Sequence, residues 1–250
     1  MSACGASMAR ISPKPTGGGG SGPRIVRASD QQGVALIAVL LWTALVTALA
    51  SAIVLVTTVE TTISARHRDG IDALYAADAA LEIAVGQLAG VTNWDLVLNG
   101  TSRSTSSDGA PTGTRQIADG TSIDLDRLTA ALRCGKESAC SDADTNAITV
   151  DRPWGISNPR WQLFLCGSLG TIAGLPDGAT RAYVLVWMAD DPSDNDGDPL
   201  RDSIAADNPG RGRILVTAQA YGTSGARRTI QATVVRAAAG IRMVTWREVI

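Results

Sequence analysis

Apolar residues are most concentrated near the N-terminus, where the 26 residues 34–59 contain no charged side chain. As a helix that rises about 1.5 Å per residue, this run would be roughly 39 Å long, enough to cross the ~30 Å hydrocarbon core of a bilayer with some tilt. Its few Thr and Ser hydroxyls can donate to backbone carbonyls one turn back, so they are compatible with lipid. The pattern predicts a membrane-spanning helix over residues 34–59.

The helical pattern continues beyond the uncharged run. Residues 61–88 contain no Pro, and their apolar side chains recur at helical spacing among alanines. We therefore expect one helix from about Val34 to Ala89, ended by Gly90. Its second half, residues 60–90, would be amphipathic and would dock on a domain outside the membrane.

The C-terminal part changes to the period of β-strands. Five runs are β-rich and alternate between apolar and polar residues for much of their lengths; they span residues 161–166, 181–188, 213–221, 227–236 and 241–249. The short Gly222–Gly225 link predicts a β-hairpin. An antiparallel sheet of this kind needs cover on one face, which the amphipathic half of the helix can supply. The predicted fold class is α+β, a long N-terminal helix packed on a C-terminal antiparallel sheet.

Composition divides the 250-residue chain further. Residues 1–33 are rich in Gly, Pro and Ser and predict a flexible leader. Residues 91–159 contain stretches of Ser, Thr and Gly and are predicted to be loop-like. The part beyond Ala89, about 160 residues, is enough for one modest core, so residues 91–250 would form one domain of loop and sheet.

Charges beside the apolar run predict its orientation. The leader has a net charge of +3, whereas the residues just after the run carry a net charge of −1. The positive-inside rule then places residues 1–33 in the cytoplasm and the C-terminal domain in the periplasm, as a single-pass protein of the inner membrane. A cleaved secretory signal is the alternative, but the run is too long for a signal core and no small-x-small cleavage site ends it.

Charge and motifs argue against two classes of function. The whole chain has a net charge of −2, which leaves about −5 outside the leader, and we expect no direct binding of nucleic acid. The single histidine, His67, lies between two arginines, where a surface position is expected. The sequence has no nucleophile-elbow, P-loop or zinc-protease motif. We therefore expect a protein that is not an enzyme.

Cysteines offer one structural hypothesis. Cys134 and Cys140 lie close together in a Gly-, Ser- and Asp-rich segment on the side of the membrane predicted to be oxidising, which favours a disulfide over two free thiols. The spacing of a CxxC metal or redox site is absent. Cys166 lies in a strand-like run and is expected to be a buried thiol, and Cys4 belongs to the leader.

A cluster of aspartates near residue 196 suggests a metal site. Its candidate ligands for Ca²⁺ are Asp191, Asp194, Asp196, Asp198 and Asp202. Oxygen ligands at two-residue spacing, with Gly197 at a sharp turn, suit this ion, although the spacing is not that of an EF-hand. The alternative is a solvated acidic turn between two strands, so Ca²⁺ is a hypothesis and no cofactor is certain.

Four segments together resemble a known family. They are Gln32–Leu41 (QGVALIAVLL), Leu74–Glu82 (LYAADAALE), Gly212–Gly222 (GRILVTAQAYG) and Ala232–Arg236 (ATVVR). With the basic leader and the helix-plus-sheet pattern, they resemble PilX-type minor pilins of the type IV pilin and pseudopilin superfamily. The resemblance implies a pilin-like fold, cleavage by a prepilin peptidase between Gly33 and Val34, and a role in priming or capping a pilus. It also implies major and minor pilins and an inner-membrane assembly platform as partners, and a place in the extracellular pilus after assembly.

The chain departs from major pilins at two positions. Major pilins carry Glu at the fifth mature position, which here is Ala38, and they usually begin with Phe or Met where this chain has Val34. That carboxylate neutralises a neighbour's terminal ammonium in the apolar filament core, where an unpaired charge is costly. A subunit without it suits a minor, initiating position.

Other readings remain open on the sequence alone. A minor pseudopilin of a type II secretion system shares the anchor. From another class, a membrane-anchored periplasmic binding domain that is never cut at Gly33 would also fit. A membrane-tethered hydrolase fits least well, because the residues for it are missing.

Overall fold

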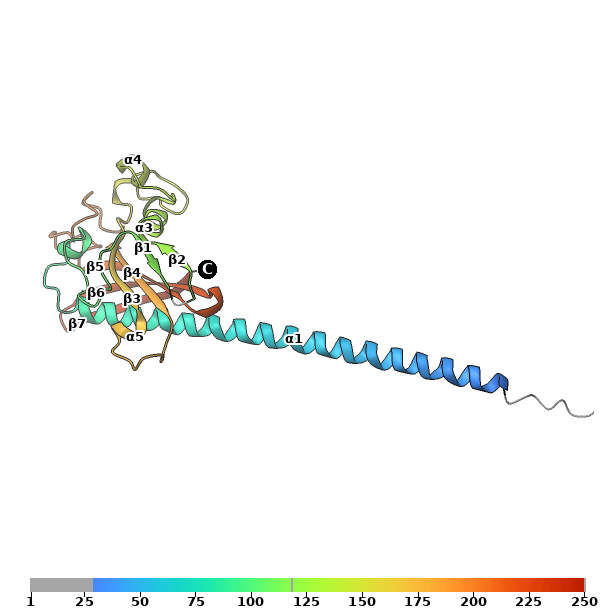
Figure 1. Cartoon of the computed structure of the whole chain (residues 1–250). Coiled ribbons are helices and arrows are strands. Elements are labelled where there is room, and N and C mark those ends of the chain that lie inside the picture. Colours follow the sequence, from blue (N-terminus) through green and yellow to red (C-terminus); the bar gives the residue numbers. More distant parts are fainter. Residues whose placement is uncertain (1–28, 118, 250) are drawn as a thin grey trace, which may run out of the picture. The chain divides into compact units, whose positions relative to one another are not determined.

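The computed structural model describes residues 29–117 and 119–249, which fall into two compact units that divide between Thr58 and Val59. The leader up to residue 28, including Cys4, lies outside the described residues. Helix α1 (Ser29–Leu88) contributes its first part to one unit and its second part to the other (Figure 1).

The first unit, as far as it is described, is the apolar part of α1. Every residue from 33 to 58 is exposed. The hydroxyls of Thr47 and Ser51 donate to the carbonyls one turn earlier, at 2.7 and 2.8 Å, so they need no water. Among the described residues, α1 is the one helix long and apolar enough to cross a membrane.

Helix α1 begins at Ser29, earlier than the expected start at Val34, and ends at Leu88, just before the expected Ala89. The earlier start has a simple cause. No Pro separates Ser29 from Val34, and Gly33 inside a helix costs only about 1 kcal/mol relative to Ala.

The second unit is built on a five-stranded antiparallel sheet in which sequence neighbours pair in the order β3-β4-β5-β6-β7. The strands are β3 (Gln162–Ser168), β4 (Tyr183–Asp190), β5 (Arg213–Tyr221), β6 (Arg227–Ala237) and β7 (Gly240–Val249). Each corresponds to one of the five predicted runs. The predicted hairpin between β5 and β6 is also present, closed by the short 3₁₀ turn η2 (Thr223–Gly225).

One face of the sheet packs on the second part of α1, as the alternating pattern predicts. The helix contributes small side chains to this core: Ala73, Ala76, Ala77, Ala80 and Ala84 are buried, together with Leu81 and Leu88. Alternate residues of the strands face them, among them Val216, Ala218 and Ile230, each fully buried. Because alanine side chains are short, the helix axis can lie close to the sheet, and the apolar area between them is removed from water.

Polar contacts fix the position of α1 along the strands. The hydroxyl of Thr223 donates to Asp69 at 3.0 Å, and the indole N–H of Trp246 donates to Asp78 at 2.9 Å. These bonds join α1 to the β5–β6 turn and to the edge strand β7. Packing of alanine side chains alone would allow α1 to shift along the sheet, and these directional hydrogen bonds favour one position.

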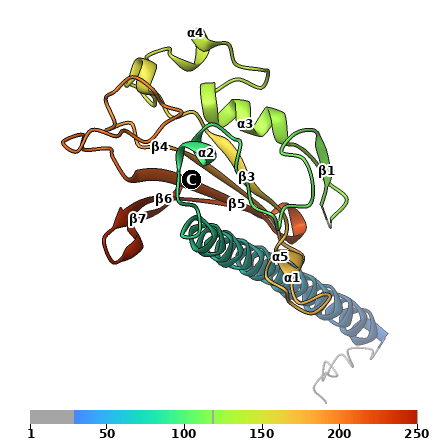
Figure 2. The same ribbon diagram turned by 90° about the vertical axis from the view of Figure 1, so that its left-hand side faces the viewer.

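The opposite face of the sheet is covered over β3 and β4 by helix α3 (Leu125–Cys134) and the small hairpin β1 (Thr114–Gln116)–β2 (Ser122–Asp124) (Figure 2). Trp187 is 1% exposed there, and its indole N–H donates to Thr129 at 2.9 Å. Strand β4 is therefore buried on both faces. The sequence predicted cover for one face only.

The prediction that residues 91–159 are loop-like was wrong in part. Besides β1, β2 and α3, they contain α2 (Asp95–Leu98), α4 (Asp142–Thr145) and η1 (Gly155–Ser157), and α5 (Leu169–Ile172) follows β3. Local signals explain α3: the side chain of Asp124 caps its first turn by accepting from Arg127 N at 3.1 Å, and Gly135 ends it with φ 73°.

The alanine packing of α1 can be tested with two substitutions of equal size. We expect Ala80→Leu, at a fully buried position against the sheet, to lower the free energy of unfolding by about 1–3 kcal/mol, because added methyl groups force the helix and sheet apart. Ala65→Leu, at an exposed position of the same helix, should change it by less than about 0.5 kcal/mol. Urea unfolding of residues 59–250 measures both, and equal effects would contradict this packing.

Candidate functional site

The expected leader junction, Gly33–Val34, lies within the first turns of α1. Val34 is 68% exposed, and a Cβ built on Gly33 would meet no atom within 4 Å. The structure neither shows nor excludes cleavage there, so cleavage stays a prediction. Ala38 is exposed on the same stretch and offers no carboxylate.

The surface of α1 after this junction is almost wholly apolar. Trp42, Leu41 and Leu55 are 66–67% exposed. Exposed apolar area of this extent is unfavourable in water, so it needs lipid or the apolar helices of other subunits. This part of the chain can therefore anchor the protein or pack in an assembly.

The aspartates proposed as calcium ligands are engaged in hydrogen bonds of their own loop, and calcium binding there stays a prediction. Within the described residues, no group of three or more His, Cys, Asp or Glu side chains is arranged to hold a metal ion. Each carboxylate instead accepts from backbone N–H groups of its own loop: Asp191 from Ser193, Asp196 from Asp198, and Asp198 from Leu200. Asp202 accepts from Gly212 at 2.6 Å. These are the turn-forming bonds that aspartate makes in loops.

The acidic loop is also less solvated than an exposed turn. Asp194 is only 2% exposed and accepts from Ser203 N at 2.9 Å and from the amide group of Asn208. Gly210 passes directly over its backbone, since a Cβ at Gly210 would lie 2.2 Å from Asp194 N. Asp194 therefore organises the loop between β4 and β5 from inside.

Asp190, the last residue of β4, is the titratable group that the sequence reasoning missed. It is 3% exposed, and its Oδ1 accepts no hydrogen bond from the described residues. Burial, followed by the charges of Asp194 and Asp202, raises the pKa of this carboxyl to about 9. It is therefore neutral at pH 7. Its position at the end of the buried run 183–190 was the available signal.

A second polar cluster, in which Cys166 and Tyr183 are buried and Asp108 is exposed, joins the segment before β1 to the sheet. The Asp108 carboxylate accepts from the hydroxyl of Tyr183 at 2.7 Å and from the thiol of Cys166 at 3.4 Å. Burial and then the charge of Asp108 raise the pKa of the Cys166 thiol to about 11, so it stays protonated. A protonated, buried thiol is a poor nucleophile, and we interpret this cluster as structural.

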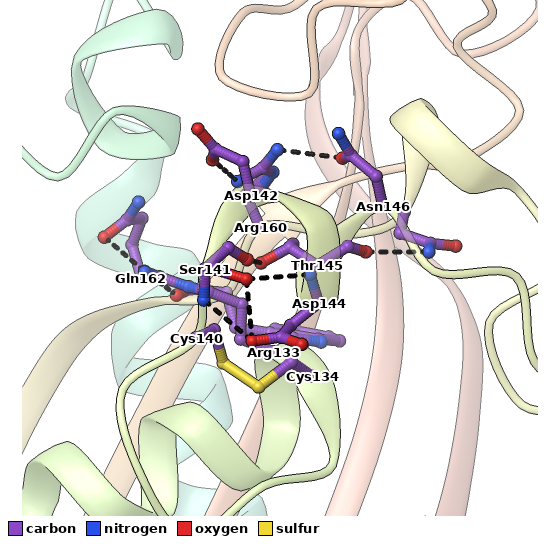
Figure 3. A network of polar contacts seen from close by, with 12 residues as sticks. Arg133, Cys134, Cys140, Ser141, Asp142, Asp144, Thr145, Asn146, Arg160 and Gln162 are labelled. Carbon is purple, nitrogen blue, oxygen red and sulfur yellow. Dashed lines mark hydrogen bonds and ion pairs between the residues drawn. A yellow bond between two sulfur atoms is a disulfide. The ribbon is translucent and has the colours of Figure 1, made fainter.

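The segment after α3 forms a small cross-linked lobe (Figure 3). The structure joins Cys134 to Cys140 by a disulfide, and Ser141 forms a capping box with Asp144 at the start of α4. Hydrogen bonds from Lys136 and then from Ser141 lower the pKa of the Asp144 carboxyl to about 2. The lobe is attached to the sheet by Arg133, which donates to the carbonyl of Trp161 at 2.7 Å.

The chain between α4 and β3 is held by two side chains. Arg152 donates to the carbonyls of Arg133 and Cys134, each at 3.0 Å. Asn158 is fully buried and donates to the carbonyls of Thr145 and Ala147 at 2.9 and 3.0 Å. Apolar side chains nevertheless remain exposed on this segment, namely Ile148, Val150, Trp154 and Ile156.

The two parts of α1 thus combine an exposed apolar helix with an alanine-lined helix docked on a sheet, and it is this element that a comparison with known families finds. Residues 32–82 match the PilX N-terminal family model. The match spans 51 of the 250 residues and covers the apolar run and most of the docked part of α1. No curated protein and no solved structure gives a match.

The PilX N-terminal match supports part of the resemblance seen in the sequence. The first two motifs, Gln32–Leu41 and Leu74–Glu82, lie inside it. It links the N-terminal segment to minor pilins of type IV pili and agrees with a membrane-anchoring helix. The motifs at 212–222 and 232–236 lie on strands outside the match, so their likeness stays a prediction.

The buried carboxyl of Asp190 makes stability depend on pH. Between its ordinary pKa of 3.8 and about 9, the folded chain keeps a proton that the unfolded chain has lost. The free energy of unfolding should therefore fall as pH rises through this window, by at most about 1.4 kcal/mol per pH unit. Asp190→Asn removes this titration, so the variant should be more stable than the wild type at pH 8 and about equal to it at pH 4.

Urea unfolding of residues 59–250 at both pH values measures the difference. Some dependence of the free energy of unfolding on pH should remain in Asp190→Asn, because burial raises the pKa of Asp202 as well. Asp191→Asn is the matched control. Asp191 is the next residue along the chain, its side chain is partly exposed, and Asn can accept the same turn hydrogen bond from Ser193 N. An Asp190→Asn variant with the wild-type slope would show that this carboxyl is ionised in the fold.

Proposed function

We propose that this protein is a minor pilin-like subunit that acts in type IV pilus biogenesis, where it primes or caps filament assembly. The observation that carries the proposal is the PilX N-terminal match over residues 32–82, on a helix whose first part exposes apolar side chains and whose second part docks on a sheet. Such a helix can leave lipid only for another apolar environment, and a bundle of similar helices is one.

Ala38 supports a minor position in the filament. In a repeating subunit, a carboxylate near the mature N-terminus would compensate the ammonium of a neighbour inside the apolar bundle. This chain has no acidic residue between Val34 and Val59, so it cannot provide that compensation. A subunit at the start or tip of a filament does not need to provide it.

The proposed topology and partners follow from the minor pilin-like role. The basic leader stays in the cytoplasm, α1 crosses the inner membrane, and residues 59–250 lie in the periplasm. A prepilin peptidase cuts after Gly33, and major and minor pilins and the assembly platform then receive the subunit. The role is structural and includes no catalysis.

Processing tests the pilin-like reading directly. Co-expression of the full chain with an active prepilin peptidase should remove residues 1–33 and leave Val34 as the N-terminal residue, read by intact mass and N-terminal sequencing. Gly33→Trp should block cleavage, because a large side chain cannot enter a site shaped for glycine. Gly86→Ala, at an exposed helix position with open space around it, should be processed normally. An uncut wild-type chain would favour a permanently anchored periplasmic domain.

The minor role predicts a particular deletion phenotype. In the native host, loss of this protein should reduce the number of pili seen by electron microscopy while the remaining pili keep their architecture. The protein should be present in purified pili at a small fraction of the major subunit. Its appearance as the dominant subunit would overturn the argument from Ala38, and unchanged pili with blocked protein secretion would identify a secretion pseudopilin instead.

A further inference from the structure

The face of the sheet opposite α1 is open over its last two strands. The cover supplied by α3 and the β1–β2 hairpin contacts β3, β4 and two side chains of β5, Leu215 and Tyr221. Because side chains alternate along a strand, residues in register with these two point to the same face. The pairing places Tyr221 beside Arg227 and Thr217 beside Gln231, and it places Gln231 beside Arg247 on the next strand.

This open face carries an unusual set of charges. Four exposed arginines point to it: Arg213, Arg227, Arg242 and Arg247. Arg213 and Arg242 flank Val235 on either side of β6, two strand spacings or about 10 Å apart. None of the four forms an ion pair within the described part of the chain.

No carboxylate on β5, β6 or β7 balances them on this face. The one acidic residue of these strands, Glu248, is paired with Ile230 of the α1-side core and so faces α1, where it pairs with Arg228. The polar residues between the arginines bind one another, as in the hydrogen bond from Thr245 to Thr233 at 2.8 Å and that from Arg247 to Gln231 at 3.1 Å. The face is thus positive on a chain whose net charge is −2.

We propose that this basic face, defined by Arg213, Arg227, Arg242 and Arg247, is a docking surface for an acidic segment of a partner protein. Exposed guanidinium groups that form no ion pair within the described chain can make paired, charge-assisted hydrogen bonds with carboxylates of that segment. The arginines lie on three adjacent strands. A segment that contacts several of them must therefore match their spacing and run in a defined direction across the strands. The edge position of β7 leaves the approach open.

Two features favour an acidic protein segment over an extended polyanion such as nucleic acid. The aspartate-rich loop joins β4 to β5 and ends beside Arg213, with Asp196 and Asp207 exposed. A long polyanion that continued past this end of the sheet would meet those negative charges, whereas a short segment would not. The face also has no exposed aromatic ring for stacking bases: Tyr221 is partly buried, and its hydroxyl donates to Gln219 at 2.7 Å.

The test uses the full chain, purified in a non-ionic detergent, and so does not depend on a role in pili. The probe is a short fluorescent peptide rich in Asp and Glu, measured by anisotropy against a single-stranded oligonucleotide of equal charge and vesicles containing phosphatidylglycerol. We expect the peptide to bind most tightly and its affinity to fall with added salt. Arg242→Gln with Arg247→Gln should weaken it about tenfold.

The control variant, Arg181→Gln with Arg201→Gln, removes the same charge at exposed positions elsewhere and should bind the peptide as the wild type does. Thermal melting checks that both variants are folded. Tighter binding of the oligonucleotide or the vesicles would assign the face to that partner and overturn the proposal. Absence of peptide binding, or equal weakening by the two double variants, would also overturn it.

Discussion

The close contact between the alanine-lined side of α1 and the sheet is the interaction on which the second unit depends. It supplies most of the helical side of the larger core, and the strands contribute alternate apolar side chains to it, among them Val216, Ala218 and Ile230. Larger side chains on the helix would separate the layers, and polar ones would bury unpaired groups. The same helix continues into the exposed apolar run, so one element serves both the core and the anchor.

The sequence predicted secondary structure well wherever a long segment kept one pattern of apolar and polar residues. The uncharged run at 34–59 and the alternation in β5 and β6 predicted the helix, the strands and their antiparallel pairing. Between residues 91 and 159 the elements are short, and their signals are single residues such as the cap at Asp124 and the left-handed Gly135. Serine- and threonine-rich composition masked them, and with them the second layer over β3 and β4.

The candidate sites show the same limit. Spacing alone suggested that the aspartates of the β4–β5 loop share an ion, but spacing does not show whether an oxygen points to a shared centre or to its own backbone. In the fold most of them serve local turns, and burial raises the pKa of Asp190, which lies outside the predicted set. The basic face was likewise hidden, because its four arginines are far apart in sequence and only strand register gathers them.

The hydrogen bonds that join α1 to the sheet also determine the order in which the chain can complete its fold. Thr223 contacts Asp69 across 154 positions and Trp246 contacts Asp78 across 168, whereas every strand of the sheet pairs with its neighbour in sequence. During synthesis α1 emerges first, yet the strands that cover its alanine side emerge last. For most of that time this side of the helix is uncovered, and other apolar segments can compete for it until β7 is made.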